Sequence, residues 1–201
     1  MQEKDPVWTW MSAAFAMATV IAAGVLAVYG TKPRAINLAL LMTARWSFLL
    51  FWLAYAGGGL AVLFGPVAQP IARHGREFGL SFAAAHLVHV GLVAWLCLIG
   101  AAPGWGLFYF FVPPLLVVYV IALFSIPTLH MKLSRPLWAI LRTGGMTYIA
   151  YAFGVDFLAD PFSRGPKHII LYAPFALMTV TGPALHLLWL VSPLWRERKT
   201  A

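Results

Sequence analysis

The stretch from Phe78 to Gly100, FGLSFAAAHLVHVGLVAWLCLIG, is apolar and contains no acidic residue, no lysine and no arginine. A helix rises about 1.5 Å per residue, so about 20 residues match the roughly 30 Å hydrocarbon core of a bilayer. The stretch therefore predicts a membrane span. It holds two histidines near its middle, His86 and His89, which are one helical turn apart and are expected to project from one face.

Five further windows outside this stretch are also apolar and long enough to span a bilayer. Hydrophobic residues make up 62% of the chain and charged residues only 10%, which excludes a soluble domain of this length. The sequence predicts an all-α, polytopic membrane helix bundle that forms a single transmembrane domain over residues 1–201. The six expected spans are about 7–30, 46–66, 78–100, 107–127, 136–158 and 168–191. They leave no room for a soluble catalytic domain, so a flavin or nucleotide site within this chain is not expected.

The net charge of +8 comes from basic residues that lie mostly in short loops between the predicted spans. This pattern predicts contact with a lipid bilayer and gives no indication of a nucleic-acid partner. Six spans place eight bases on one side and five on the other, which predicts that both termini are cytoplasmic. The first set is Lys4, Arg73, Arg76, Lys132, Arg135, Arg196, Arg198 and Lys199; the second is Lys32, Arg34, Arg45, Arg164 and Lys167.

An ionisable side chain in mid-membrane needs a partner. For His86 and His89 this can be a polar group on a neighbouring helix, a buried water or a metal. A haem held between helices would use neutral imidazole nitrogens on its two axial faces. His86, His89 and His186 are the predicted metal ligands, and His168, at the outer end of the sixth span, is a further candidate. His74 and His130 lie in basic loops, where solvation explains them.

A haem would also need apolar walls and basic residues near the interface for its propionates. The Phe, Leu and Trp content supplies the walls, and Arg73 with Arg76, or Arg164 with Lys167, could bind the propionates. Zinc fits less well, because it prefers Cys or carboxylate ligands and the spans offer only Cys97 and Asp156. No nucleophile–base arrangement or phosphate-binding glycine loop is present, so no catalytic residue is predicted.

Two segments carry a resemblance to a known family. GREFGLSFAAAHLVHV, residues 75–90, resembles the span of ferric reductase-like transmembrane proteins that starts with basic residues and has a His ten positions after a Gly, here Gly79 and His89. LFSIPTLHMKLSRPLWAILRTGGMTYIAYAFG, residues 123–154, resembles the family's turn, basic loop, Trp and following helix. The likeness extends over roughly residues 40 to 190.

The family includes ferric reductases, NADPH oxidases and the haem-binding membrane subunit of the bacterial periplasmic methionine sulfoxide reductase system. Its members bind haem b and pass electrons across the membrane. The resemblance implies a haem b-binding membrane electron carrier, with His89 the closest match to a family ligand. It implies a membrane oxidoreductase subunit of the bacterial inner membrane, whose electron donor is a separate redox protein or a quinol.

The chain departs from the family in the fifth predicted span. Members carry a His pair there, whereas this chain has Arg142 at the first position and Val155 or Asp156 near the second. Either His186 or His168 replaces the missing ligand, or haem binding is lost. The alternative function is therefore a non-redox membrane subunit or small transporter on the same scaffold.

Overall fold

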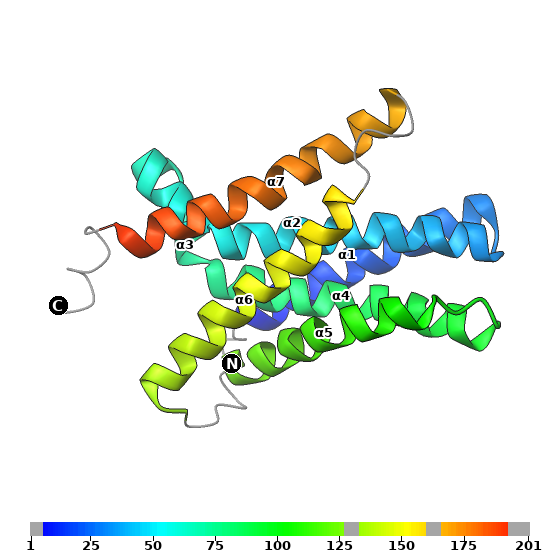
Figure 1. The fold of residues 1–201 in the computed structure, drawn as a ribbon, viewed down its shortest axis with the longest axis horizontal. Helices are drawn as coiled ribbons and strands as arrows, with labels where there is room; N and C mark the ends of the chain where they lie inside the picture. Colours follow the sequence, from blue (N-terminus) through cyan, green and yellow to red (C-terminus); the bar gives the residue numbers. More distant parts are fainter. Residues whose placement is uncertain (1–5, 127–132, 160–165, 193–201) are drawn as a thin grey trace. The chain divides into compact units, whose positions relative to one another are not determined.

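Every regular element in the described part of the chain is a helix (Figure 1). The structure is a computed structural model that describes residues 6–126, 133–159 and 166–192. The elements in order are α1 (Pro6–Tyr29), α2 (Pro33–Phe64), a 3-10 turn (Gly65–Val67), α3 (Gln69–Arg73), α4 (Gly75–Leu98), α5 (Trp105–Ser125), α6 (Arg135–Leu158) and α7 (Pro166–Val191). The predicted all-α class is confirmed.

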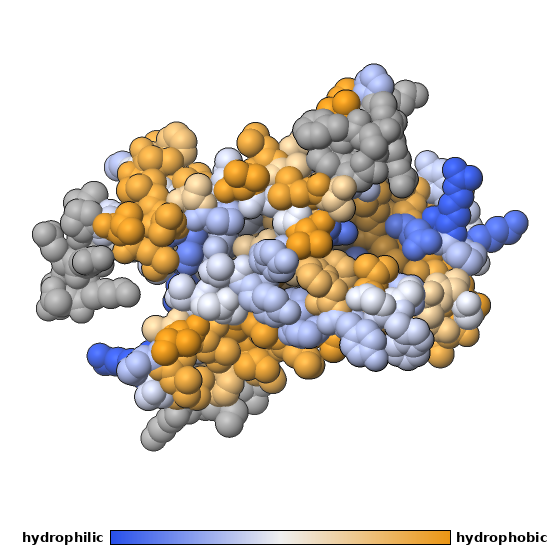
Figure 2. All heavy atoms as spheres, viewed as in Figure 1, coloured by the Kyte–Doolittle hydropathy of each residue, from blue (hydrophilic) through white to orange (hydrophobic). Residues whose placement is uncertain are grey.

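Five of these helices are long and apolar enough to cross a bilayer. They are α1, α2 with its 3-10 extension, α4, α5 and residues Ile169–Val191 of α7. Figure 2 shows apolar side chains exposed over much of the visible face, as lipid contact requires. The chain is therefore an integral membrane protein. Helix α6 covers the remaining predicted span with 24 residues, but it contains Arg135, Arg142 and Asp156 and is not among the five, so this sixth crossing stays a prediction.

Helix α2 begins much earlier than the sequence analysis expected. The expected span covers residues 46–66 and counts Arg45 among the loop bases, but the helix starts at Pro33 and runs for 32 residues. Pro33 suits a first helical position, and the apolar run that follows it has no helix-breaking residue before Gly57. Arg45 thus lies well inside the helix with only 6% of its surface exposed, and it cannot be counted as a loop base. At about 48 Å, α2 is longer than the hydrocarbon core.

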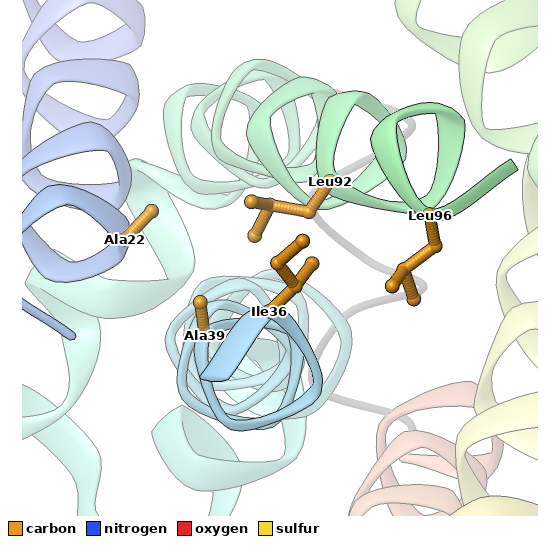
Figure 3. Packing of buried hydrophobic residues seen from close by; sticks show 5 residues of the cluster. All are labelled: Ala22, Ile36, Ala39, Leu92 and Leu96. Carbon is orange, nitrogen blue, oxygen red and sulfur yellow. The ribbon is translucent and has the colours of Figure 1, made fainter. Parts of the chain in front are cut away.

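The chain divides into two compact units. The first contains residues 1–51 and 77–130, and the second contains residues 52–76 and 131–201. In the first unit, an apolar cluster joins α1, α2 and α4. Figure 3 shows Ile36 of α2 close to Leu92 of α4, with Ala22, Ala39 and Leu96 around them.

Small side chains let α1 approach its neighbours in the first unit. Its buried residues are Val7, Ala14, Ala18 and Ala22, which recur at spacings that place them on one helix face. Lipid tails are as apolar as leucine, so helices associate in a membrane through close packing rather than through burial of apolar surface from water. The indole Nε1 of Trp46 also donates a 3.1 Å hydrogen bond to the carbonyl of Ala14, which joins α2 to α1.

In the second unit, glycines allow the last part of α2 to approach α7 closely. A Cβ added to Gly59 would collide with the backbone carbonyl of Leu185, and one added to Gly58 would lie 2.7 Å from the Trp189 ring. The indole Nε1 of Trp52 donates a 2.9 Å hydrogen bond to the carbonyl of Met178 across the same contact. The glycine triplet therefore permits the close helix approach expected of small residues in a span.

Candidate functional site

His86 and His89 project from one face of α4, as predicted. Their rings stack with centroids 5.2 Å apart and planes inclined by 21°. One turn earlier on the same helix, the ring of Phe82 lies 5.5 Å from that of His86, and the ring of Phe51 in α2 lies 5.3 Å from that of Phe82. The imidazole pair thus continues a row of aromatic side chains inside the first unit.

The Nδ1 atom of His89 faces helix α2. It lies 3.2 Å from the backbone carbonyl oxygen of Leu40 and 3.4 Å from Oγ1 of Thr43. A carbonyl oxygen can only accept, so Nδ1 must carry the proton and donate it. In the neutral ring, Nε2 then keeps its lone pair. The geometry fixes His89 in the tautomer that can bind a metal through Nε2.

His86 lacks such an anchor. Its Nδ1 atom is buried and has no hydrogen-bond partner among the described residues. A buried polar nitrogen in this state is costly unless something outside the chain satisfies it. His86 is therefore a second ligand candidate one turn from His89.

His186 forms a comparable arrangement in the second unit. Its Nδ1 atom donates to the backbone carbonyl of Tyr55 in α2 at 3.2 Å. Its ring stacks on that of Tyr55 at 4.3 Å and lies 5.4 Å from that of Trp189. Nε2 is buried and has no partner within the described part of the chain. His186 thus offers the same kind of ligand nitrogen as His89.

The remaining predicted site residues are less informative. Arg73 ends α3 and Arg76 lies in the first turn of α4, both exposed, and their role in binding propionates stays a prediction. His168 lies in the first turn of α7, but its side chain and that of Lys167 are outside the described residues, as are Arg164 and His130. His74 is exposed and donates from Nδ1 to the carbonyl of Pro70 at 2.9 Å, consistent with a loop residue.

His89 would suit a haem as a ligand to its iron. His89 is held on its Nδ1 side and leaves Nε2 for the iron, which is how haem-binding histidines are used. Its ring is stacked on that of His86, so these two side chains would not hold a haem between them, and a second ligand would be supplied by another helix. His186 belongs to the other unit, and its predicted pairing with His86 or His89 stays a prediction. Among the described residues, no group of three or more His, Cys, Asp or Glu gathers to hold a bare metal ion.

The groups that orient the histidines are not among the residues predicted from the sequence. They are the carbonyls of Leu40 and Tyr55 and the hydroxyl of Thr43. Backbone carbonyls leave no signal in a sequence. Thr43 does leave one, as a hydroxyl at the end of the mostly apolar run AINLALLMT, but the span was expected to begin beyond it.

Comparisons with protein-family models, with curated proteins and with solved structures gave no match. The function is therefore inferred from the residues themselves.

Proposed function

We propose that this chain is a haem b-binding membrane electron-transfer protein that resembles ferric reductase-like transmembrane subunits. Its electron donor would be a separate redox protein or a quinol. The observation that carries the proposal is the geometry of His89, whose Nδ1–H is directed at the Leu40 carbonyl and whose Nε2 is left as a ligand nitrogen. His186 supports it independently, with the same tautomer fixed by the Tyr55 carbonyl.

The chain's own residues would supply binding and orientation. His89 would bind iron through Nε2, and the Leu40 carbonyl would keep the imidazole from rotating. Phe82, packed between His86 and Phe51, would provide an apolar wall beside the ligand pair. A bound haem would supply the one-electron ferric–ferrous couple, and its potential would depend on the axial ligands and on the hydrogen bonds they make.

The visible spectrum of the full chain, purified in detergent from haem-supplemented cells, tests this proposal. We expect a Soret band and, after reduction, the sharp bands of a b-type haem. His89→Ala should abolish or strongly reduce this absorption, whereas His74→Ala, which alters an exposed loop histidine, should leave it unchanged. Wild-type protein without haem absorption, or an unaltered spectrum in His89→Ala, would overturn the proposal.

Helix α6 favours the alternative function. Arg142, exposed on this helix, stands where the resembling family has a histidine ligand. A featureless spectrum of the wild-type protein would therefore favour a non-redox membrane subunit or small transporter. Haem content separates the two functions because only the first requires the histidines as ligands.

We also propose a location in a bacterial inner membrane with both termini in the cytoplasm. The support is the excess of basic residues on one side of the predicted spans. The sequence gives eight bases against five, and removing the buried Arg45 from the five leaves eight against four. Reporter fusions at the C-terminus and in the 160–167 segment should report opposite sides of the membrane. The same side for both would refute this topology.

A further inference from the structure

We propose that Thr43 is a positioning residue for His89 and lowers the reduction potential of the haem bound there. This inference rests on the proposed function. Thr43 is fully buried in α2, and its Oγ1 lies 3.4 Å from the His89 Nδ1 atom. No other side chain in the described residues is placed to hydrogen-bond with that nitrogen.

The hydroxyl of Thr43 has a defined role in its contacts. Its Oγ1 lies 2.9 Å from the Ala39 carbonyl and 3.1 Å from the Leu40 carbonyl, and a hydroxyl has one proton to donate. With that proton directed at Ala39, the shorter contact, a lone pair of Oγ1 faces the His89 Nδ1–H. The Nδ1 proton then lies between two acceptors, Oγ1 of Thr43 and the carbonyl of Leu40.

Two acceptors hold the ring more firmly than one. They restrict its rotation, and they draw the Nδ1 proton away from the ring, which makes Nε2 a more basic ligand. A more basic ligand stabilises ferric over ferrous iron, so the hydrogen bond lowers the potential. The simpler explanation is that Thr43 only bonds to carbonyls of its own helix, as threonines in membrane helices commonly do.

Three variants separate these explanations. Thr43→Val removes the hydroxyl while nearly keeping the shape, and Thr43→Ser restores the hydroxyl. Ser47→Ala is the matched control, because Ser47 is also fully buried in α2 and bonds to a carbonyl of its own helix, that of Thr43. A potentiometric titration of the haem-loaded protein should show a higher midpoint potential in Thr43→Val than in the wild type. At the wild-type midpoint potential, the ratio of ferric to ferrous haem in Thr43→Val should be about threefold lower than in the wild type. That change corresponds to about 28 mV at 59 mV per tenfold for one electron.

A measurement without haem keeps this inference separate from the proposed function. In 15N-histidine-labelled protein, the imidazole signals of His89, assigned by their loss in His89→Ala, should show a protonated Nδ1. They should shift in Thr43→Val, recover in Thr43→Ser and stay unchanged in Ser47→Ala. If the wild type binds no haem, the proposed function fails and the effect on potential fails with it, while these signals still decide whether Thr43 positions His89. Unchanged His89 signals in Thr43→Val, or no recovery in Thr43→Ser, would overturn the positioning role.

Discussion

The two units present a histidine in the same tautomer but surround it differently. In the first unit, His89 contacts two polar side chains: the Thr43 hydroxyl lies beside its Nδ1, and the imidazole of His86 is stacked on its ring. In the second unit, His186 is stacked on Tyr55 with Trp189 nearby, and its Nδ1 has a single carbonyl acceptor. Both acceptor carbonyls belong to α2, so one helix orients both histidines.

The two surroundings affect different properties of the imidazole. A hydroxyl beside Nδ1 can tune the basicity of the ligand nitrogen, whereas aromatic rings fix the orientation of the imidazole without changing its hydrogen bonding. If haem binds as proposed, the first unit would adjust its potential through Thr43, whereas the second unit packs its imidazole against aromatic rings. The helices around the two sites also pack by different means, through alanines in the first unit and through glycines in the second.

The largest expected effect tests whether the two sites are equivalent. His186→Ala should reduce the Soret absorbance per protein, because His186 offers a buried ligand nitrogen of the same tautomer as His89. The measurement is the haem absorbance of purified protein, normalised to protein concentration. An unchanged spectrum would show that His186 is not a haem ligand and that the two histidine sites are not equivalent.

The double variant His89→Ala/His186→Ala tests whether the two histidines bind one iron or two. If both histidines bind one iron, the double variant resembles either single variant. If each serves its own haem, the two losses add. His74→Ala is the control in both cases because that histidine is exposed outside the spans.

The second effect concerns the alanine-lined core of the first unit. Leu92→Ala should lower the free energy of unfolding by about 3 kcal/mol, because it leaves a cavity between α2 and α4. Leu87→Ala on the same helix is the control: Leu87 is 50% exposed whereas Leu92 is 5% exposed. The measurement is reversible unfolding in mixed micelles. Equal losses in the two variants would show that this core does not stabilise the protein.

The ends of most helices could be predicted from apolar length alone. The predicted spans 7–30 and 136–158 differ from α1 and α6 by one residue or less at each end. The early start of α2 could not be predicted, because a charge in an apolar run normally indicates a loop, and only tertiary packing buries Arg45. In the site, helical periodicity predicted that His86 and His89 share a face. The acceptors of His89 and His186 could not be found, since they come from a helix distant in sequence.

The third effect concerns the glycine contact of the second unit. Gly59→Ala should destabilise the protein by about 2 kcal/mol, because the added Cβ collides with the Leu185 carbonyl and must separate α2 from α7. Gly154→Ala is the matched control, since a Cβ there meets nothing within 4 Å. Thermal unfolding in detergent should show the loss only for Gly59→Ala. Equal midpoints for the two variants would contradict the close approach.

The smallest effect concerns a side-chain hydrogen bond of Tyr55, the residue on which His186 stacks. Its hydroxyl lies 3.3 Å from Oγ1 of Thr147 in α6. Hydrogen bonds between membrane helices contribute about 0.6 kcal/mol on average, so a double-mutant cycle of Tyr55→Phe and Thr147→Val should give a coupling of that size. Because Tyr55→Phe keeps the aromatic ring on which His186 stacks, the haem absorption spectrum should not change. A shifted spectrum in Tyr55→Phe would mean that the hydroxyl acts on the His186 imidazole, in the way that we propose for Thr43 and His89 in the first unit.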